Sequence, residues 1–223
     1  MSVDLERPRS VRTRRGWFVW LALTSVAIAV YAPFPYLTSS LASLAVDDGG
    51  LAANYVSRPP AIQAALYLHI VAGGLALGLS PLQLARRVRA RAPRLHRVVG
   101  RVVIAAMTMG GLSGMVLSGV NAAGPVGVAG FGLLGALWVV FPVLALRAIR
   151  RRDVRAHERW MVRGFALTYA GVMLRLWLVL LLTAQGAAGI PADVAFERAY
   201  AFMPFLCWVP NLVVAELYLR RRA

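Results

Sequence analysis

Four side chains within otherwise apolar segments have the clearest chemical potential in this sequence: His69, His96, His157 and Arg175. An imidazole binds metals and exchanges protons near neutral pH. An arginine inside a long apolar segment is costly, so it usually faces a partner or a cavity. These four residues are therefore the first candidates for a functional site.

Each histidine belongs to a helical stripe of small or polar residues. At ~100° per residue, the members of each stripe fall within about 40° of the direction of its histidine. The stripes are His69, Gly73, Ala76, Ser80, Gln83 and Arg87; then His96, Gly100, Val103, Met107, Gly110, Gly114, Ser118 and Asn121; then His157, Met161, Gly164, Thr168, Gly171 and Arg175. Small residues let helices approach closely, so these faces should point inward, either for packing alone or to line a cofactor or substrate site.

Positions along the apolar segments divide the candidates into two sites. His69 lies nine residues into its segment, ~14 Å deep at 1.5 Å per residue, and Arg175 has a similar depth. His96 and His157 each open a segment at the opposite face. The first predicted site contains His96, Gly100, Arg101, His157, Arg163 and Glu216. The second, deeper site contains His69 and Arg175, with Tyr67 and Tyr169 on neighbouring faces.

The first site suits a haem b, because His96 and His157 on different helices could both ligate the iron. Nearby arginines could hold the propionates, and glycines in the same stripes would admit the flat macrocycle. His69 has no second histidine at its level. A membrane redox or haem-b-type protein is therefore one interpretation, with an unidentified electron partner.

Two other classes of protein fit the same residues. In a proton-coupled small-molecule transporter, Arg175 would bind an anionic group and His69 would exchange a proton. In a non-enzymatic accessory subunit, all of these residues would serve packing. The sequence contains no Ser/His/Asp set, zinc-ligand spacing or phosphate loop, which excludes hydrolase and ATPase functions. Whether the protein is an enzyme stays open, as do its substrate and oligomeric state.

Composition indicates that the elements around these residues cross a membrane. The chain has 223 residues, of which 59% are hydrophobic and 15% charged, against ~25% charged in soluble domains. The sequence therefore predicts an all-α, polytopic bundle, a single domain over residues 16–222 behind a basic tail at 1–15. Six spans long enough to cross are expected at about 16–38, 60–85, 95–119, 128–146, 158–183 and 199–219. Residues 39–59 are expected to form a loop.

Charge placement predicts the orientation. All 25 basic residues are arginines, and all but Arg58, Arg175 and Arg198 fall in the tails and turns on one side. The positive-inside rule puts both termini and both arginine-rich turns in the cytoplasm of a bacterium, with the bundle in its inner membrane. The net charge of +16 then reflects topology and attraction to anionic lipid headgroups, not nucleic-acid binding.

Three motifs resemble one bacterial family, the predicted membrane proteins catalogued as domain of unknown function 2306. The motifs are H-I-V-A-G-G-L-A-L-G from His69, L-H-R-V-V-G-R-V from Leu95, and H-E-R-W-M-V-R-G-F-A-L-T-Y-A-G-V-M-L-R from His157. The resemblance covers roughly residues 61–182. It implies that the family pattern includes His69, His96, Gly100, Arg101, His157, Trp160, Met161, Arg163 and Arg175. It brings no established activity, and a likeness to haem-b cytochromes is one of layout only.

Overall fold

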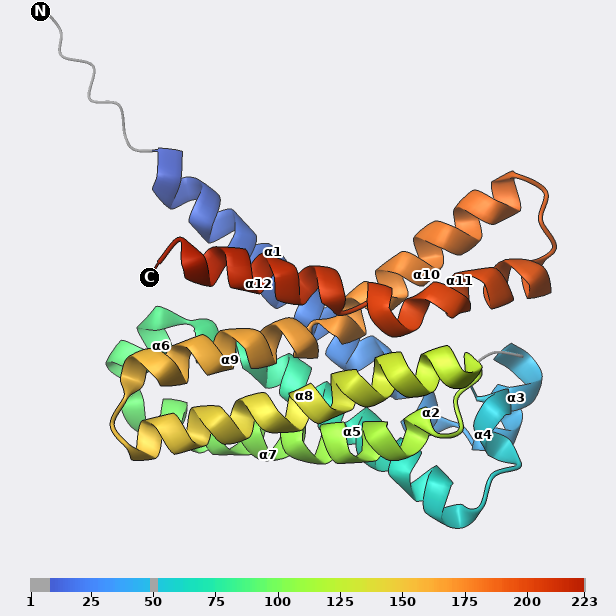
Figure 1. Ribbon diagram of the computed structural model, residues 1–223, viewed down its shortest axis with the longest axis horizontal. Helices are drawn as coiled ribbons and strands as arrows, with labels where there is room; N and C mark the ends of the chain where they lie inside the picture. The colour runs from blue at the N-terminus through green and yellow to red at the C-terminus, as the bar shows by residue number, and fades with distance from the viewer. Residues whose placement is uncertain (1–8, 49–51, 223) are drawn as a thin grey trace, which may run out of the picture.

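The computed structural model describes residues 9–48 and 52–222, and these form helices without any strand (Figure 1). Of the basic tail expected at residues 1–15, residues 1–8 lie outside the described part, and the remainder belongs to the first helix. In chain order the helices are α1 (Arg9–Tyr31), α2 (Phe34–Thr38), α3 (Leu41–Asp48), α4 (Ala53–Val56), α5 (Pro60–Leu84), α6 (Arg86–Arg91), α7 (Pro93–Ser118), α8 (Gly124–Arg150), α9 (Val154–Thr168), α10 (Ala170–Ala187), α11 (Ala192–Leu206) and α12 (Val209–Arg220).

Six stretches of the described chain are long and apolar enough to cross a membrane, which confirms the all-α, six-span prediction. They are Gly16–Thr38, Pro60–Leu84, Pro93–Ser118, Gly124–Arg150, Val154–Ala187 and Ala192–Arg220. Most of them extend beyond the predicted limits, because helices continue past the apolar core into polar or small residues. The sixth, for example, begins seven residues earlier than residue 199, so Asp193 belongs to the first turn of α11 and not to a loop.

The predicted loop at 39–59 was wrong in part, since it contains the short helices α3 and α4. Leu41 of α3, Ala52, and Tyr55 of α4 are buried together with Leu66 of the second span and Leu117 of the third. Burial raises the pKa of the Tyr55 phenol above its ordinary value. Residues 86–91, expected as a turn, likewise form the short helix α6. Buried apolar contacts therefore accompany α3 and α4 in a segment whose composition indicated a loop.

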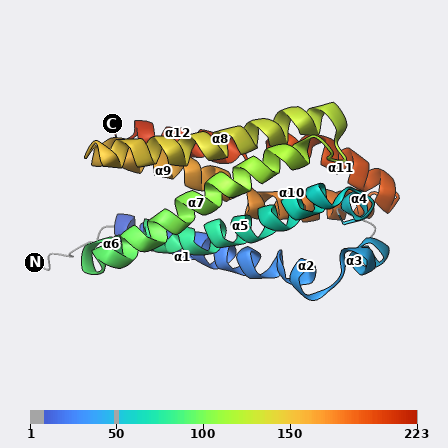
Figure 2. The same ribbon diagram turned by 90° about the horizontal axis from the view of Figure 1, so that it is seen from below.

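The core of the bundle is made by α5, α7, α8 and α9, with α7 running obliquely between α5 and α8 (Figure 2). Close approach depends on glycine: a Cβ at Gly111 would lie 2.7 Å from the carbonyl oxygen of Gly135 on α8. Val103 and Met107 of α7 are fully buried beside this contact. Small residues thus allow close helix approach in this core, although Gly111 and Gly135 were not members of the predicted stripes.

The remaining helices pack around this core. Helix α1 lies on α5, where Ala29 and Pro33 fill the space left by Gly74 and Gly78. Helices α10 and α11 form a hairpin that leaves the core at an angle, and α12 returns along α9 (Figure 1).

Three spans are interrupted within the bundle. Pro35 and Pro210 each lie four residues after a helix end, at Tyr31 and Leu206. A proline ring clashes with the carbonyl four residues earlier, which ends α1 and α11 at these points. The fifth span breaks at Tyr169 without any proline.

The break at Tyr169 coincides with two side-chain hydrogen bonds to the backbone of α9. The Thr168 hydroxyl donates to the Gly164 carbonyl at 2.9 Å, a bond that tends to bend helices. Asn211 of α12 donates to the Ala166 carbonyl at 3.3 Å and to that of Cys207 at 3.1 Å. Asn211 therefore joins the breaks of the fifth and sixth spans.

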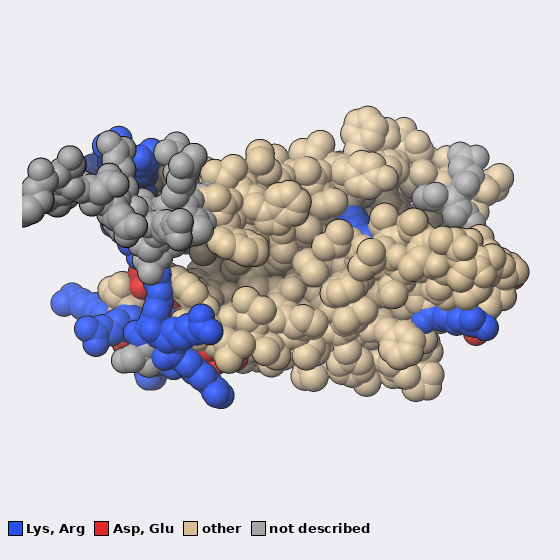
Figure 3. Space-filling view, turned by 90° about the horizontal axis from the view of Figure 1, so that it is seen from above, with Lys and Arg blue, Asp and Glu red and all other residues tan. Residues whose placement is uncertain are grey.

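Basic side chains gather at one end of the molecule, beside a long surface that carries almost no charge (Figure 3). The described ends of the chain lie at this same end (Figure 1). Beside the basic end the surface is hollowed, and two small basic patches lie apart from it, one within the apolar surface and one near the opposite end (Figure 3). This distribution agrees with the separation of arginines predicted from the sequence.

Candidate functional site

His157 is held by the backbone of a neighbouring helix. Asp153 caps α9 by accepting a hydrogen bond from the Ala156 amide at 2.9 Å, which places His157 in the first turn. Its Nδ1 lies 2.9 Å from the Ala145 carbonyl of α8. A carbonyl only accepts, so Nδ1 carries the proton and donates. With the proton on Nδ1, Nε2 is the ring nitrogen that can accept a hydrogen bond or bind a metal, the arrangement usual for metal-binding histidines.

His96 lies in the first turn of α7, which begins at Pro93. Its Nδ1 is buried and has no hydrogen-bond partner within the described part of the chain. The amide nitrogen of Gln83, at the end of α5, is also buried and also has no hydrogen-bond partner among the described residues. Buried polar atoms are nearly always paired, so two such atoms at one end of the bundle indicate a place for a polar ligand or water.

Gly100 makes room for Gln83. A Cβ at Gly100 would lie 3.0 Å from Gln83 Oε1, and Gly100 follows His96 by one helical turn. Gln83 was part of a predicted stripe but was not named among the site residues. Only the packing of α5 on α7 shows that it belongs beside His96.

His96 and His157 come within electrostatic range of each other at the basic end, and Arg89 also acts on His96. Arg89 of α6 is itself paired with Glu158 of α9 at 2.8 Å. These side chains are 44% and 50% exposed, so the pair contributes at most about 1 kcal/mol to stability. Its significance is geometric, because it connects the start of α9 to the segment that precedes α7.

Arg163 and Glu216 form a separate clamp between α9 and α12. Arg163 Nε and Nη2 donate to the two carboxylate oxygens at 2.5 and 2.9 Å, and the guanidinium lies 4.8 Å from the Trp160 ring centroid. Both residues were predicted as members of the histidine site. The bidentate pair leaves Arg163 less available for another anion. Arg101, the other predicted member, is exposed.

His69 is enclosed by α7 and α8. Its Nδ1 donates to the Gly110 carbonyl at 2.9 Å, and its ring meets Trp138 edge-on at 6.1 Å between centroids. A Cβ at Gly114 would lie 3.1 Å from the His69 ring, and one at Gly110 would lie 2.7 Å from Trp138. The glycines of the second stripe therefore create the space for this ring pair.

Trp138 is a central residue that sequence reasoning missed. Its Nε1 donates to the Thr168 hydroxyl at 2.9 Å, directly before the break in the fifth span. It thus connects the His69 region to α9. A buried tryptophan needs a partner for its N–H, but the sequence does not show which residue provides one.

The other deep candidates have separate partners. Arg175 Nη1 donates to the Gly171 carbonyl at 2.8 Å, which is a neutral partner. It lies within electrostatic range of His69, Tyr31 and Tyr36. The Tyr169 hydroxyl is hydrogen-bonded to Thr24 of α1 at 2.8 Å.

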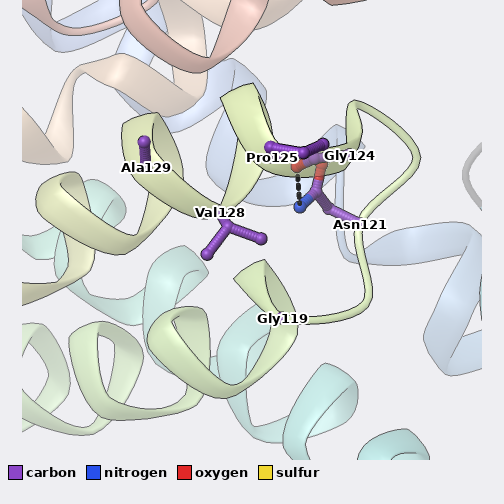
Figure 4. Close-up of a pocket in the computed structure, with 6 residues that line it drawn as sticks. All are labelled: Gly119, Asn121, Gly124, Pro125, Val128 and Ala129. Atoms are coloured by element: carbon purple, nitrogen blue, oxygen red, sulfur yellow. Dashed lines mark hydrogen bonds between the residues drawn. The ribbon is translucent and has the colours of Figure 1, made fainter.

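A depression at the opposite end lies beside the turn between α7 and α8 (Figure 4). Its lining includes Asn121, Pro125 and Val128. Asn121 accepts from the Ala123 amide and donates to the carbonyls of Ser118 and Gly124. Its polar atoms therefore stabilise the turn itself.

Tyr67, the remaining residue predicted for the deep site, is half-buried on α5.

The histidine motifs fall within a match to a known family. Residues 66–219 match the family described as predicted membrane protein DUF2306. The chain belongs to this family. The match extends through the sixth span, beyond the end at residue 182 expected from the motifs, so the DUF2306 pattern also covers the Arg163–Glu216 clamp. No curated protein and no solved structure matches the chain.

Among the described residues, no group of three or more His, Cys, Asp and Glu side chains is placed to hold a metal ion. A haem iron differs from such a site, because the porphyrin provides four nitrogens and the protein provides only one or two axial ligands. Two histidines on separate helices suffice for that purpose.

Proposed function

We propose that this DUF2306 protein is a membrane redox protein that holds one haem b between His96 and His157. The observation that carries the proposal is the pair of imidazoles on α7 and α9, within electrostatic range of each other at the basic end. His157 offers Nε2 because its Nδ1 is committed to Ala145. His96 has a buried ring nitrogen without a partner.

The surrounding residues fit a haem in part. The Gln83 side chain fills the space beside Gly100, and its unpaired amide N–H could donate to a carboxylate. Arg101 is exposed on the same helix and available to a propionate. Arg163 remains with Glu216 and keeps α12 on α9. Bound haem would supply one-electron transfer, and its position at the basic end favours a partner on that membrane face.

The test is the visible spectrum of the full-length protein purified from haem-replete cells. We expect a Soret band that shifts on reduction with dithionite and is lost in His96→Ala and in His157→Ala. His69→Gln is the matched control and should keep the Soret band, because His69 contacts Gly110 and Trp138 and not the predicted haem ligands. A colourless wild-type protein that is folded and monodisperse would overturn the proposal.

A proton-coupled small-molecule transporter is the second candidate. It is favoured by the interrupted fifth and sixth spans, which Asn211 joins inside the bundle. Interrupted spans with free backbone groups line the binding sites of many secondary transporters. Proteoliposomes containing a pH-sensitive dye should then change internal pH when supplied with carboxylates or amino acids. A haem-free protein that gives no such response to any compound would refute this candidate.

A further inference from the structure

Arg175 is a cation with unused hydrogen-bonding capacity in the apolar part of the fifth span. A guanidinium has five N–H donors and keeps its charge in proteins. Only one bond, to the Gly171 carbonyl, is seen from Arg175 within the described residues. The two ion pairs found there, Arg89–Glu158 and Arg163–Glu216, use other arginines. A carbonyl is a dipole, so it leaves the charge of Arg175 uncompensated.

The side chain is too deep to reach an aqueous surface. Arg175 lies twelve residues before the end of α10 at Ala187, ~18 Å at 1.5 Å per residue. An arginine snorkels to an interface only from near a helix end. The described acidic residues nearest in sequence, Glu158 and Asp193, lie at opposite ends of the molecule, beside the starts of α9 and α11.

The surroundings of Arg175 are open to lipid. Helix α10 leaves the core at an angle and touches α1, so the seam between them faces the membrane (Figure 1). Tyr31, which is in electrostatic range of Arg175, is 70% exposed, and Leu176 beside the arginine is 55% exposed. A ligand that reaches this arginine from the lipid would therefore need a hydrocarbon tail.

We propose that Arg175 anchors the carboxylate of a long-chain fatty acid, or an equivalent single-tailed anionic amphiphile, in the seam between α1 and α10. A carboxylate matches the fork of the guanidinium and compensates its charge. The tail would lie along the exposed apolar residues of both helices. A phospholipid headgroup stays at the interface, and a small aqueous anion would have to enter an apolar seam. This site is independent of the proposed haem.

The experiment measures binding of radiolabelled oleate to the full-length protein in maltoside detergent. We expect saturable binding that weakens at least about tenfold in Arg175→Gln, since a charge-assisted pair is lost. Arg175→Lys should retain part of the affinity. The matched control is Arg198→Gln, which should bind oleate as the wild type does. Arg198 is exposed and lies at the end of the molecule opposite the arginine-rich turns.

Competition on the wild-type protein decides the chemistry without any variant. Unlabelled oleate should displace the probe, whereas oleyl alcohol, with the same chain and no charge, should not. Equal displacement by the alcohol would show that only the tail is recognised, and displacement by acetate would show a site for free anions. Either result, or unchanged binding by Arg175→Gln, overturns the proposal.

A photoreactive diazirine analogue of oleate locates the site even where a variant fails to fold. Crosslinks mapped by mass spectrometry should fall on α1 and α10, around Tyr31 and Leu176. Crosslinks confined to other helices would contradict the placement.

Discussion

At the scale of single residues, glycines decide which side chains can meet. Gly110 and Gly114 admit Trp138 and His69, and Gly100 admits Gln83. The sequence predicted that these stripes face inward, because small residues at helical spacing have few other uses in a membrane bundle. It did not predict what fills the space, since each occupant comes from another helix. The sequence therefore indicated which faces carry the three histidines, but it did not show that Gln83 and Trp138 lie against the glycines of those faces.

Partners far along the chain account for the other difference at this scale. Arg163 and Glu216 were assigned to the histidine site because they share its level. They are 53 residues apart and pair with each other. The depth of a residue in the bundle follows from its position along its helix. Whether two side chains at the same depth meet depends on how α12 is rotated about its own axis relative to α9. That rotation is set by packing, which a single sequence does not reveal.

Gly130 gives a sharp test of the packing, because its neighbours are rigid atoms. A Cβ at Gly130 of α8 would lie 2.5–2.8 Å from backbone and ring atoms of Pro204 on α11, which cannot yield like a flexible side chain. Gly130→Ala should therefore destabilise the protein by about 1–3 kcal/mol. Gly186→Ala is the control, because nothing lies within 4 Å of its Cβ position. Thermal unfolding in detergent should show a lower midpoint for Gly130→Ala alone; equal midpoints would mean that α8 and α11 are less closely packed.

At the scale of elements, the interruptions of the spans have two origins. Those after Tyr31 and Leu206 follow from Pro35 and Pro210, and are readable from local sequence. The one at Tyr169 involves Asn211, 45 residues from the Ala166 carbonyl that it contacts. The sequence suggested one continuous helix from about residue 158 to 183 because the apolar pattern does not pause there.

Removal of Asn211 tests whether this contact holds the two interruptions together. Asn211→Leu takes away the donor to Ala166 and Cys207, so amide hydrogens around Tyr169 and Trp208 should exchange faster. Hydrogen–deuterium exchange in detergent measures this change. Asn54→Leu is a matched control, because Asn54 also donates to a distant carbonyl, that of Val120, but at another part of the molecule. Equal exchange in wild type and Asn211→Leu would show that the interruptions do not depend on this residue.

At the scale of the whole molecule, composition was sufficient for the architecture. Six apolar segments separated by charged or Gly/Pro-rich turns define six spans, since the bilayer fixes their length. The angle at which α10 and α11 leave the core could not be foreseen, because lipid-facing and protein-facing apolar residues look alike in sequence. That angle is what exposes the seam around Arg175.

Orientation in the membrane is the remaining property of the whole molecule, and arginine placement predicts it. Fusions of a cytoplasm-active reporter after Arg91, Arg152 and Arg222 should be active, and fusions after Asn121 and Gly189 should be inactive. A reporter active only outside the cytoplasm should give the inverse pattern at the same five positions, which controls for expression. The physical reason is that moving an arginine-rich turn across the bilayer is opposed by the membrane potential and by anionic lipid at the inner face. If the fusion after Arg152 instead reported a location outside the cytoplasm, His96, His157 and the basic turns would not share the cytoplasmic side of the membrane. There would then be no reason to look for an electron partner in the cytoplasm.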